Sequence, residues 1–320
     1  ILLILILQLL NFPKPGPILL LMLLSICLGS FSMSSVLFQS RLQASRVVRL
    51  NIFQALLFIL CPMVSIHILG KNYQVLLFGL IFAYFLPVLW IFASKRRLVK
   101  LDIVKLFSSL GQFLSFGIPI SLWFATSLSL NFLDRYFLEY YTGLESMGIY
   151  ASYSEIFTRF FSLILFPITM ALHPYLTKLW NQGEFNKASR YLKWGIAIQA
   201  GIFFLFLILL VTFDNPIQKM MTMIIPSLNL DMAHLMIPLF MGGFFWQISL
   251  LLHKPLELME RTRYMLIFML VAVALNILGN TQFISLYGSI ATAYTNIATA
   301  LVYNLLVLIV SLKFWLSRVL

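Results

Sequence analysis

Long apolar stretches are the feature that most restricts how this chain can fold. A helix needs about 20 mostly apolar residues to cross a hydrocarbon layer about 30 Å thick, because each residue rises about 1.5 Å. About nine such stretches follow one another along the chain. They cover approximately residues 19–38, 51–69, 73–93, 110–133, 144–171, 194–213, 232–252, 264–278 and 286–312. The sequence therefore predicts an all-α, polytopic membrane helical bundle.

The first ten residues, Ile1–Leu10, are apolar but too few to cross a membrane. The sequence also does not begin with Met. We interpret Ile1–Leu10 as part of a tenth span and expect the sequence to be truncated at its N-terminus. A signal peptide fits less well, because the segment has neither a charged beginning nor a cleavage site after small residues.

Basic residues are concentrated in one set of alternate loops, which predicts the orientation of the chain. Lys and Arg in short loops remain on the cytoplasmic side. By the span edges above, about 17 basic residues lie in one set and about 4 in the other. The larger set is Arg41, Arg46, Arg49, Lys95, Arg96, Arg97, Lys100, Lys105, Lys178, Lys187, Arg190, Lys193, Lys254, Arg261, Arg263, Lys313 and Arg318. We expect a bacterial inner-membrane protein with a cytoplasmic C-terminus.

The net charge of +12 does not by itself indicate nucleic-acid binding. The basic residues are divided among five short loops, and no soluble domain displays them together. Anionic membrane lipids are the expected partners of these loops. The basic loop 95–105 also separates the last six spans from the earlier ones. It predicts a cytoplasmic linker between the remainder of an N-terminal lobe, residues 1–94, and a C-terminal six-helix lobe, residues 106–320.

Residues suited to catalysis or metal binding are sparse. Cys27 and Cys61 lie in separate predicted spans and form no C-x-x-C motif. The four histidines lack the spacing of metal ligands, and no glycine-rich phosphate loop lies outside the predicted spans. We therefore expect no resident metal, no cofactor and no nucleotide hydrolysis.

One predicted span, 144–171, carries ionisable residues at membrane depth. Glu155 and Arg159 are spaced i,i+4 on one helix face, and Ser152 and Ser162 extend this face. Such a face is expected to contact other helices or a water-filled cavity. In one interpretation the pair neutralises itself and joins the bundle. In the other, Arg159 attracts an anionic substrate while Glu155 tunes its charge or accepts a proton.

A second charged cluster lies at the outer end of the span 110–133. Asp134 and Arg135 form either a structural anchor at the membrane surface or an outer gate. The span itself is unusually polar, with Ser127 and Asn131 among its residues, and a glycine and a proline interrupt its first half. Interrupted polar helices are typical of transporters, although hydrogen bonding between helices is an equally good explanation.

A third group of charges, Glu257 and Glu260 with Lys254, Arg261 and Arg263, lies between two predicted spans. Exposed ion pairs in such a turn usually contribute little to stability. The pattern therefore predicts a solvated, salt-bridged turn without a binding role.

Several of these segments carry a family resemblance. FGIP at 116–119, the pair Asp134–Arg135 and GLESMGIYA at 143–151 resemble the central signature of polysaccharide repeat-unit flippases. Two further stretches follow in the expected order, 174–193 (PYLTKLWNQGEFNKASRYLK) and 276–296 (NILGNTQFISLYGSIATAYTN). These flippases include the O-antigen flippases of the multidrug/oligosaccharidyl-lipid/polysaccharide (MOP) exporter superfamily.

The resemblance implies a MATE-like fold of two six-helix lobes around a central cavity that opens alternately to either side. It also implies an undecaprenyl-diphosphate-linked oligosaccharide as substrate, and a polysaccharide polymerase and a chain-length regulator as partners. Arg159 matches the second helix of the C-terminal lobe, where a guanidinium can bind a diphosphate through two hydrogen bonds. The first two helices, which also line the cavity in this family, are expected to be missing.

Other function classes remain open. A drug or cation antiporter of the same superfamily is expected to have an acidic cavity, whereas the deep charges here are balanced. A peptidoglycan-precursor flippase is a nearer alternative. A membrane-bound polysaccharide polymerase or glycosyltransferase needs a large loop or a cluster of acids and bases, and the sequence shows neither. We therefore expect a transporter and not an enzyme.

Overall fold

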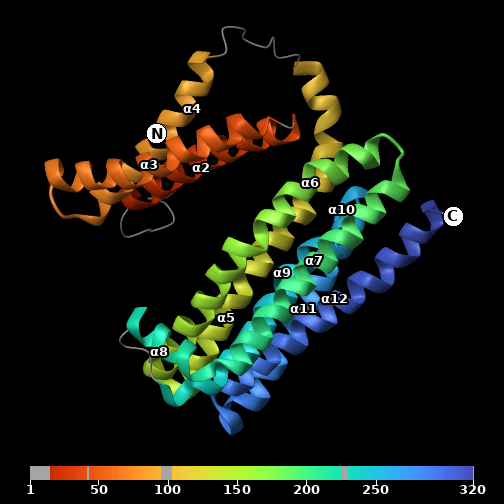
Figure 1. Ribbon diagram of the computed structural model, residues 1–320. Helices are drawn as coiled ribbons and strands as arrows, with labels where there is room; N and C mark the ends of the chain where they lie inside the picture. The colour runs from red at the N-terminus through yellow and green to blue at the C-terminus, as the bar shows by residue number, and fades with distance from the viewer. Residues whose placement is uncertain (1–14, 42, 95–102, 225–229, 320) are drawn as a thin grey trace. The chain divides into compact units, whose positions relative to one another are not determined.

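A computed structural model describes residues 15–41, 43–94, 103–224 and 230–319, and the regular elements in these ranges are all helices (Figure 1). The predicted partial span at 1–10 and most of the predicted linker at 95–105 lie outside the described residues. The chain divides into two compact units, Ile1–Leu101 and Asp102–Leu320.

The first unit contains the helices α2 (Pro15–Ser40), α3 (Ala44–Leu69) and α4 (Tyr73–Ser94). Helix α4 packs against both α2 and α3. The contact with α3 is close at Gly79, where a Cβ atom would lie 2.5 Å from the Cα atom of Pro62. The unit buries a small core of Phe31, Leu50, Val88 and Ile91, while many of its large apolar side chains are exposed. Outward apolar side chains are expected of helices surrounded by lipid.

The second unit begins with a long helical segment, α5 (Ile103–Ile164), that is interrupted at Gly143. This residue has φ 85° and ψ 169°, a conformation that glycine adopts readily because it has no Cβ atom. The segment is therefore two helices, and these correspond to the predicted spans 110–133 and 144–171. The second ends earlier than predicted because a new helix, α6 (Phe166–Asn181), starts with a proline in its first turn.

The remaining elements complete a bundle in which α11 and α12 form a hairpin turning at Gly288 (Figure 1). In chain order they are α7 (Phe185–Thr212), α8 (Asp214–Ile224), the 3₁₀ helix η1 (Leu230–Leu235), α9 (Met236–Leu252), α10 (Lys254–Leu258), α11 (Thr262–Tyr287) and α12 (Ser289–Val319). Helix α11 packs on α5, and α12 packs on α9. Gly279 allows the hairpin to close, since a Cβ atom there would lie 2.6 Å from Cγ2 of Thr295.

Phenylalanine side chains form the centre of the second unit. Phe203 of α7 stacks on Phe240 and Phe244 of α9, and Phe157 and Phe161 of α5 lie against Phe240. Aromatic rings bury a large area each, and offset pairs add roughly 0.5–1.5 kcal/mol beyond that area. This cluster therefore holds α5, α7 and α9 in a fixed arrangement and leaves the neighbouring polar side chains in defined positions.

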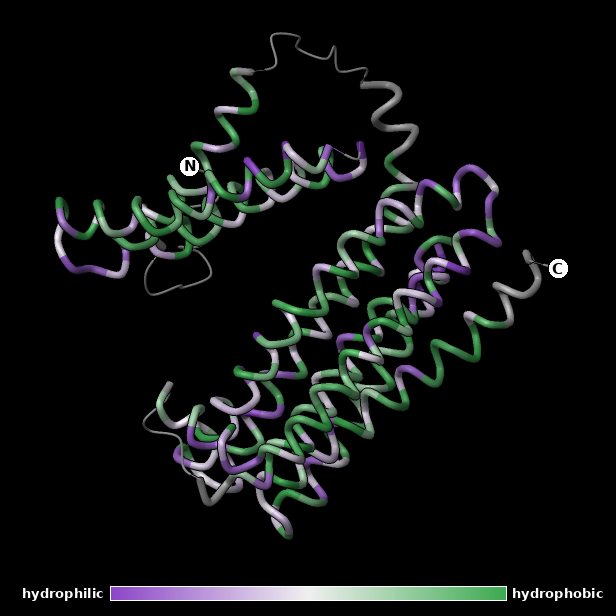
Figure 2. Tube along the Cα trace, viewed as in Figure 1, coloured by the Kyte–Doolittle hydropathy of each residue, from purple (hydrophilic) through white to green (hydrophobic). Residues whose placement is uncertain are grey.

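The helices are long and apolar enough to make this a multi-pass membrane protein. Among the described residues, 8 helical segments meet the length and hydropathy requirements of a span, and one of them, Phe113–Ile164, is 52 residues long and holds two of the predicted spans. Figure 2 shows apolar residues along the helices and hydrophilic residues mainly near their ends. The prediction of an all-α, polytopic bundle is confirmed, and each of the nine predicted stretches overlaps at least one of these segments, although 144–171 runs past Ile164 and 286–312 begins before the turn at Gly288.

Candidate functional site

The second unit contains a polar cavity of about 220 Å³ between α5, α9, α11 and α12. No Asp, Glu, Lys or Arg is among its described lining residues. Two indole rings, Trp123 and Trp246, contribute to its wall together with apolar side chains. Its polar lining consists of Ser127, Asn131, Ser154, Thr158, Ser162, Gln247, Ser249 and Asn296. The cavity therefore offers hydroxyl and amide groups and no charge.

Three amide side chains in this wall, Asn131, Gln247 and Asn296, were not among the predicted site residues. The Nε2 atom of Gln247 is buried and has no hydrogen-bond partner in the described structure. Asn296 accepts a hydrogen bond of 2.7 Å from Nε1 of Trp246. A buried donor without a partner costs about 1–3 kcal/mol, so Gln247 is suited to a ligand or to water. The sequence signal for both Gln247 and Asn296 was an amide inside an otherwise apolar helix, and Asn296 also lies in the stretch 276–296 of the family resemblance.

Asp134 lies at the centre of a buried polar cluster. Its side chain is 2% exposed, and its Oδ1 atom accepts hydrogen bonds from Asn276 (2.9 Å) and Asn280 (3.0 Å). Its Oδ2 atom accepts one from Asn296 (2.9 Å). We call these four residues the Asp134 cluster. Since Asn296 also lines the cavity, the cluster is directly connected to the cavity wall.

Asp134 and Arg135 do not form the predicted anchor. Adjacent helical residues project about 100° apart, because one turn takes 3.6 residues. Asp134 consequently points into the bundle, whereas Nη2 of Arg135 lies 3.6 Å from Oε2 of Glu155. Among the described residues, Asp134 takes part in no ion pair. The outer-gate role of these two residues stays a prediction.

Arg135, Glu155 and Arg159 form a charged stripe on α5. Nε of Arg159 donates to Oε1 of Glu155 at 2.8 Å, as the i,i+4 spacing predicts. The side chains of Glu155 and Arg159 are 46% and 74% exposed within the described chain. Ser154 and Thr158, which directly precede these two residues, line the cavity. The stripe therefore borders the cavity without entering it, and it carries one net positive charge.

The two predicted serines differ in position. Ser162 lines the cavity and donates to the carbonyl oxygen of Thr158 at 2.8 Å. Ser152 is not among the cavity residues, and its hydroxyl donates to the carbonyl oxygen of Gly148 at 2.9 Å. Of the four predicted residues on this helix face, only Ser162 contributes directly to the cavity.

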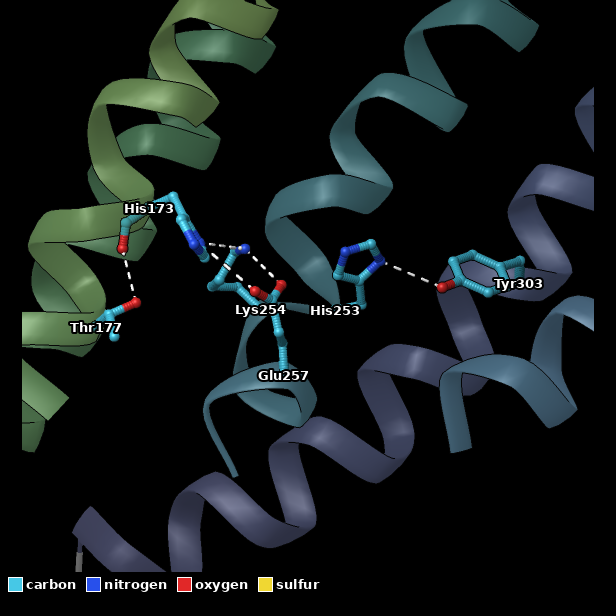
Figure 3. A network of polar contacts seen from close by, with 6 residues as sticks. All are labelled: His173, Thr177, His253, Lys254, Glu257 and Tyr303. Carbon is cyan, nitrogen blue, oxygen red and sulfur yellow. Dashed lines mark hydrogen bonds and ion pairs between the residues drawn. The ribbon is translucent and has the colours of Figure 1, made fainter. Parts of the chain in front are cut away.

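The turn after α9 is only partly the predicted solvated one: Lys254 and Glu257 belong to a largely buried polar network (Figure 3), whereas Glu260, Arg261 and Arg263 are exposed, as predicted. Lys254 is only 5% exposed, and its Nζ atom lies 2.5 Å from Oε2 of Glu257 and 2.9 Å from Nδ1 of His173 in α6. The short helix α10 packs between its neighbours, which removes these charges from solvent. Burial, and secondarily the positive charge of Lys254, lowers the pKa of His173 below its usual 6.5.

A neutral hydrogen-bonded chain continues beside this network. Nε1 of Trp123 donates to the Tyr303 hydroxyl at 2.9 Å, and that hydroxyl lies 3.2 Å from Nδ1 of His253. Because the Tyr303 oxygen already accepts from Trp123, its own proton is free to be donated to His253. Trp123 also lines the cavity. The chain therefore fixes one indole of the cavity wall.

Two family models match the sequence, over ranges that overlap. The model described as "Polysaccharide biosynthesis protein" matches residues 1–180, and the model described as "MatE" matches residues 119–282. Each covers more than half of the chain. Among curated proteins, no sequence matches this one.

Solved structures share the fold at low sequence identity. An outward-facing multidrug resistance MATE family transporter of the MOP superfamily aligns with a TM-score of 0.66 and 12% identity, covering 86% of this chain and 63% of that one. A MATE in complex with MaL6 gives 0.69 and 12%, with 90% and 67% covered. A MOP superfamily transporter from Pyrococcus furiosus, described as having a binding pocket of reversed polarity, gives 0.66 and 14%, with 86% and 63% covered.

The chain thus spans 63% of the length of the first of these transporters. The fold comparison and the two family matches agree with the resemblance seen in the sequence, and members of these families are transporters. The chain belongs to the polysaccharide biosynthesis protein and MatE families of the MOP superfamily of membrane transporters and flippases.

Proposed function

We propose that this protein moves undecaprenyl-diphosphate-linked oligosaccharide repeat units across the bacterial inner membrane, for the synthesis of O-antigen, capsule or exopolysaccharide. The match of the polysaccharide biosynthesis family to residues 1–180 supports this substrate class. Its C-terminus is cytoplasmic in this proposal, as the distribution of basic residues predicts.

The observation that carries the proposal is the charged stripe beside an uncharged polar cavity. Arg135 and Arg159 share one carboxylate, Glu155, so one positive charge is left for a ligand. Arg159 contacts Glu155 through Nε and Nη2, and no hydrogen bond of its Nη1 atom occurs among the described residues. A guanidinium with free N–H groups is well suited to a diphosphate, which it can bind through two parallel hydrogen bonds.

The cavity suits the other polar part of such a substrate. Sugars present hydroxyl groups that both donate and accept hydrogen bonds, and Ser127, Asn131 and Gln247 offer matching groups. The ligand remains covalently intact, so the protein needs only to expose its site alternately to the two sides of the membrane. We propose that the two units act as lobes in this motion.

Complementation of a flippase-deficient bacterium tests the proposal. The gene that encodes this chain is expressed as wild type, Arg159→Ala or Arg159→Lys, with membrane abundance measured in parallel. Arg190→Ala is the matched control, because Arg190 is an exposed arginine of α7 outside the cavity. We expect wild type and Arg190→Ala to restore surface glycan, Arg159→Ala to lose at least tenfold and Arg159→Lys to retain part of the activity.

Two results would contradict this proposal. Failure of the wild type to restore glycan with a range of repeat units excludes the substrate class. Full activity of Arg159→Ala at equal abundance excludes a substrate contact by Arg159 and leaves the Glu155–Arg159 pair as a structural feature.

A drug or cation antiporter is the second candidate, and the MatE match over residues 119–282 favours it. The buried carboxylate of Asp134 also fits a protein that handles cations. Expression in a bacterium sensitised to cationic drugs separates the two candidates. A rise in resistance without restoration of glycan supports the antiporter.

A further inference from the structure

The turn between α10 and α11 forms part of an open pocket of about 610 Å³ on the second unit. Binding sites for small ligands usually have volumes in this range. The described lining residues are Ser115, Met259, Glu260, Arg261, Arg263, Tyr264 and Ile267. None of them lines the polar cavity described above. The pocket is therefore a separate place on the molecule, to which the proposed function assigns no role.

The described lining of this pocket has an excess of positive charge. Arg261 and Arg263 accompany a single carboxylate, that of Glu260, and all three residues are exposed. Arg263 takes part in no ion pair among the described residues. Two guanidinium groups and one carboxylate leave one net positive charge. A guanidinium can hold a phosphate group through two parallel N–H bonds, so the pocket suits a phosphate with one negative charge.

Backbone and buried contacts hold the walls of the pocket in place. Oγ1 of Thr262, a residue that is 0% exposed, donates to the carbonyl oxygen of Phe116 at 3.2 Å and joins the start of α11 to α5. The N–H group of Arg261 donates to the carbonyl oxygen of Leu256 at 2.7 Å, across the end of α10. Both arginines are therefore carried by a defined turn, which lowers the entropy that a ligand must remove when it binds.

The pocket lies at one end of a membrane-spanning helix. The segment Thr262–Tyr287 is long and apolar enough to span a membrane, and Arg263 belongs to its first turn. Tyr264 follows, and tyrosine is typical of the headgroup level of a bilayer. In Figure 1, α10 lies at the end of the second unit where α6 passes into α7. Both turns carry the basic residues that predict the cytoplasmic side, so we expect the pocket to face the cytoplasmic leaflet.

An apolar row continues from the pocket along α11. Ile267 follows Arg263 by one helical turn, and Leu270 and Val271 follow Ile267 by three and four residues. The exposed fractions of these three apolar side chains are 52%, 52% and 39%. A free phosphate ion would gain nothing from this row. A phospholipid can place its headgroup in the pocket and an acyl chain on the row, so the continuity of the two surfaces favours a lipid ligand.

We propose that this pocket binds the headgroup of an anionic bilayer phospholipid, with phosphatidylglycerol as the expected ligand. Arg261 and Arg263 contact its phosphate, and Ile267 contacts the start of an acyl chain. Basic pockets between spanning helices on the cytoplasmic side commonly hold anionic headgroups. Phosphatidylethanolamine has no net charge, so it does not balance the pocket. The inference does not rest on the proposed function.

The proposal gives the turn a binding role that the sequence analysis did not predict. The loop charges alone indicate only solvated ion pairs, because the pocket appears when α5 packs against the start of α11. A lipid bound there contacts both elements. We therefore expect phosphatidylglycerol to raise the thermal unfolding midpoint of the protein, since a ligand that binds the folded state stabilises it.

Native mass spectrometry of the purified protein in detergent provides the test. Phosphatidylglycerol and phosphatidylethanolamine with identical acyl chains are each titrated at constant ionic strength, and the fraction of protein that carries one lipid gives the Kd. Competition with inorganic phosphate and with undecaprenyl phosphate is measured in the same way. We expect phosphatidylglycerol to bind at least tenfold more tightly than phosphatidylethanolamine, and inorganic phosphate not to displace it.

Variants of the turn identify the binding residues. The double variant Arg261→Ala/Arg263→Ala is expected to weaken phosphatidylglycerol binding at least tenfold, and Arg263→Lys to weaken it less. Glu260→Gln is expected to strengthen binding, because it removes a negative charge beside the phosphate. Misfolding does not produce such a gain. Arg190→Ala is the matched control, since Arg190 is an exposed arginine of α7 outside the pocket, and its Kd is expected to stay within twofold of the wild type.

Four results would overturn the proposal. The first is equal affinity of the folded wild type for the two phospholipids. The second is an unchanged Kd in the double variant, or in Glu260→Gln if the double variant does not fold. The third is an equal loss in Arg190→Ala and the double variant, which indicates a general attraction to basic loops. The fourth is displacement by inorganic phosphate or tighter binding of undecaprenyl phosphate, which assigns the pocket to a free anion or to a carrier lipid.

Discussion

Asp134 and Arg135 are neighbours in the sequence but belong to two very different polar regions. Asp134 is almost completely buried, and three asparagines from α11 and α12 hold it. Arg135 belongs to the exposed stripe and has one ion pair of 3.6 Å. The rotation of about 100° between adjacent helical residues is enough to separate a site fixed by the bundle from a site open to a ligand. The inner region is therefore expected to determine stability and the outer one to determine binding.

The largest expected effect is that of Asp134→Leu, which removes the acceptor from the asparagine amides. Each buried donor left without a partner costs on the order of 1–3 kcal/mol, so we expect the free energy of unfolding to fall by several kcal/mol. Denaturant unfolding of the purified protein measures this loss. A change below about 1 kcal/mol would show that the cost of burying the carboxylate offsets its hydrogen bonds.

Tyr303→Phe tests a buried hydrogen-bonded group, the Tyr303 hydroxyl, that carries no charge. The variant deprives Trp123 of its acceptor and His253 of its neighbour, and we expect a loss of about 1–3 kcal/mol in the same assay. Tyr294→Phe is the matched control, since Tyr294 is an exposed tyrosine of the same helix. Equal losses in the two variants would mean that the buried hydroxyl contributes nothing specific.

A third polar region, formed by Lys254, Glu257 and His173, can be tested by measuring how protein stability depends on pH. The pKa of His173 is below 6.5 in the folded protein, so its contribution to stability is complete above pH 6.5. Below that value the unfolded chain takes up the proton first, and the contribution is lost as the pH falls. As the pH is lowered from 7 to the pKa of His173 in the folded protein, we expect the free energy of unfolding to decrease less in His173→Gln than in the wild type. An unchanged profile would assign the pH dependence to other groups.

Glu155→Gln is expected to give the smallest change in stability, less than about 1 kcal/mol, because exposed ion pairs contribute little. The substitution frees Arg135 and Arg159 from their shared carboxylate and raises the local positive charge. In a membrane-protein unfolding assay, a loss as large as that of Asp134→Leu would contradict the distinction between the inner and outer regions.

Much of the fold could be predicted from the sequence, because the membrane imposes a length and an apolarity on each span. Helix ends were less predictable. The span expected at 144–171 crosses the junction of α5 and α6, where the regular helix is interrupted at Leu165, just before Pro167, within a locally apolar sequence. Apolarity signals that a segment lies in lipid, but it does not locate a break inside that segment.

The candidate site was predictable only where its residues are close in sequence. The Glu155–Arg159 pair follows from i,i+4 spacing on one helix. The partners of Asp134 lie 142 to 162 residues further along the chain, and helix packing alone brings them together. The resemblance singled out the segment that contains these asparagines but did not assign them a partner. The buried position of Lys254 was missed for the same reason, because His173 belongs to another helix.

The long separation between Asp134 and its asparagines also has a consequence for how the protein is made. A ribosome adds about 5–20 residues per second, so the 142 residues between Asp134 and Asn276 take on the order of ten seconds. During this time α5 must enter the bilayer with a carboxylate whose permanent partners have not yet been synthesised. Insertion of an aspartate costs about 2.5–3.5 kcal/mol at the centre of a span, and this is an upper limit for Asp134, which follows the end of the predicted span 110–133. Until α11 and α12 arrive, the carboxylate therefore needs water or an early neighbour as its temporary partner.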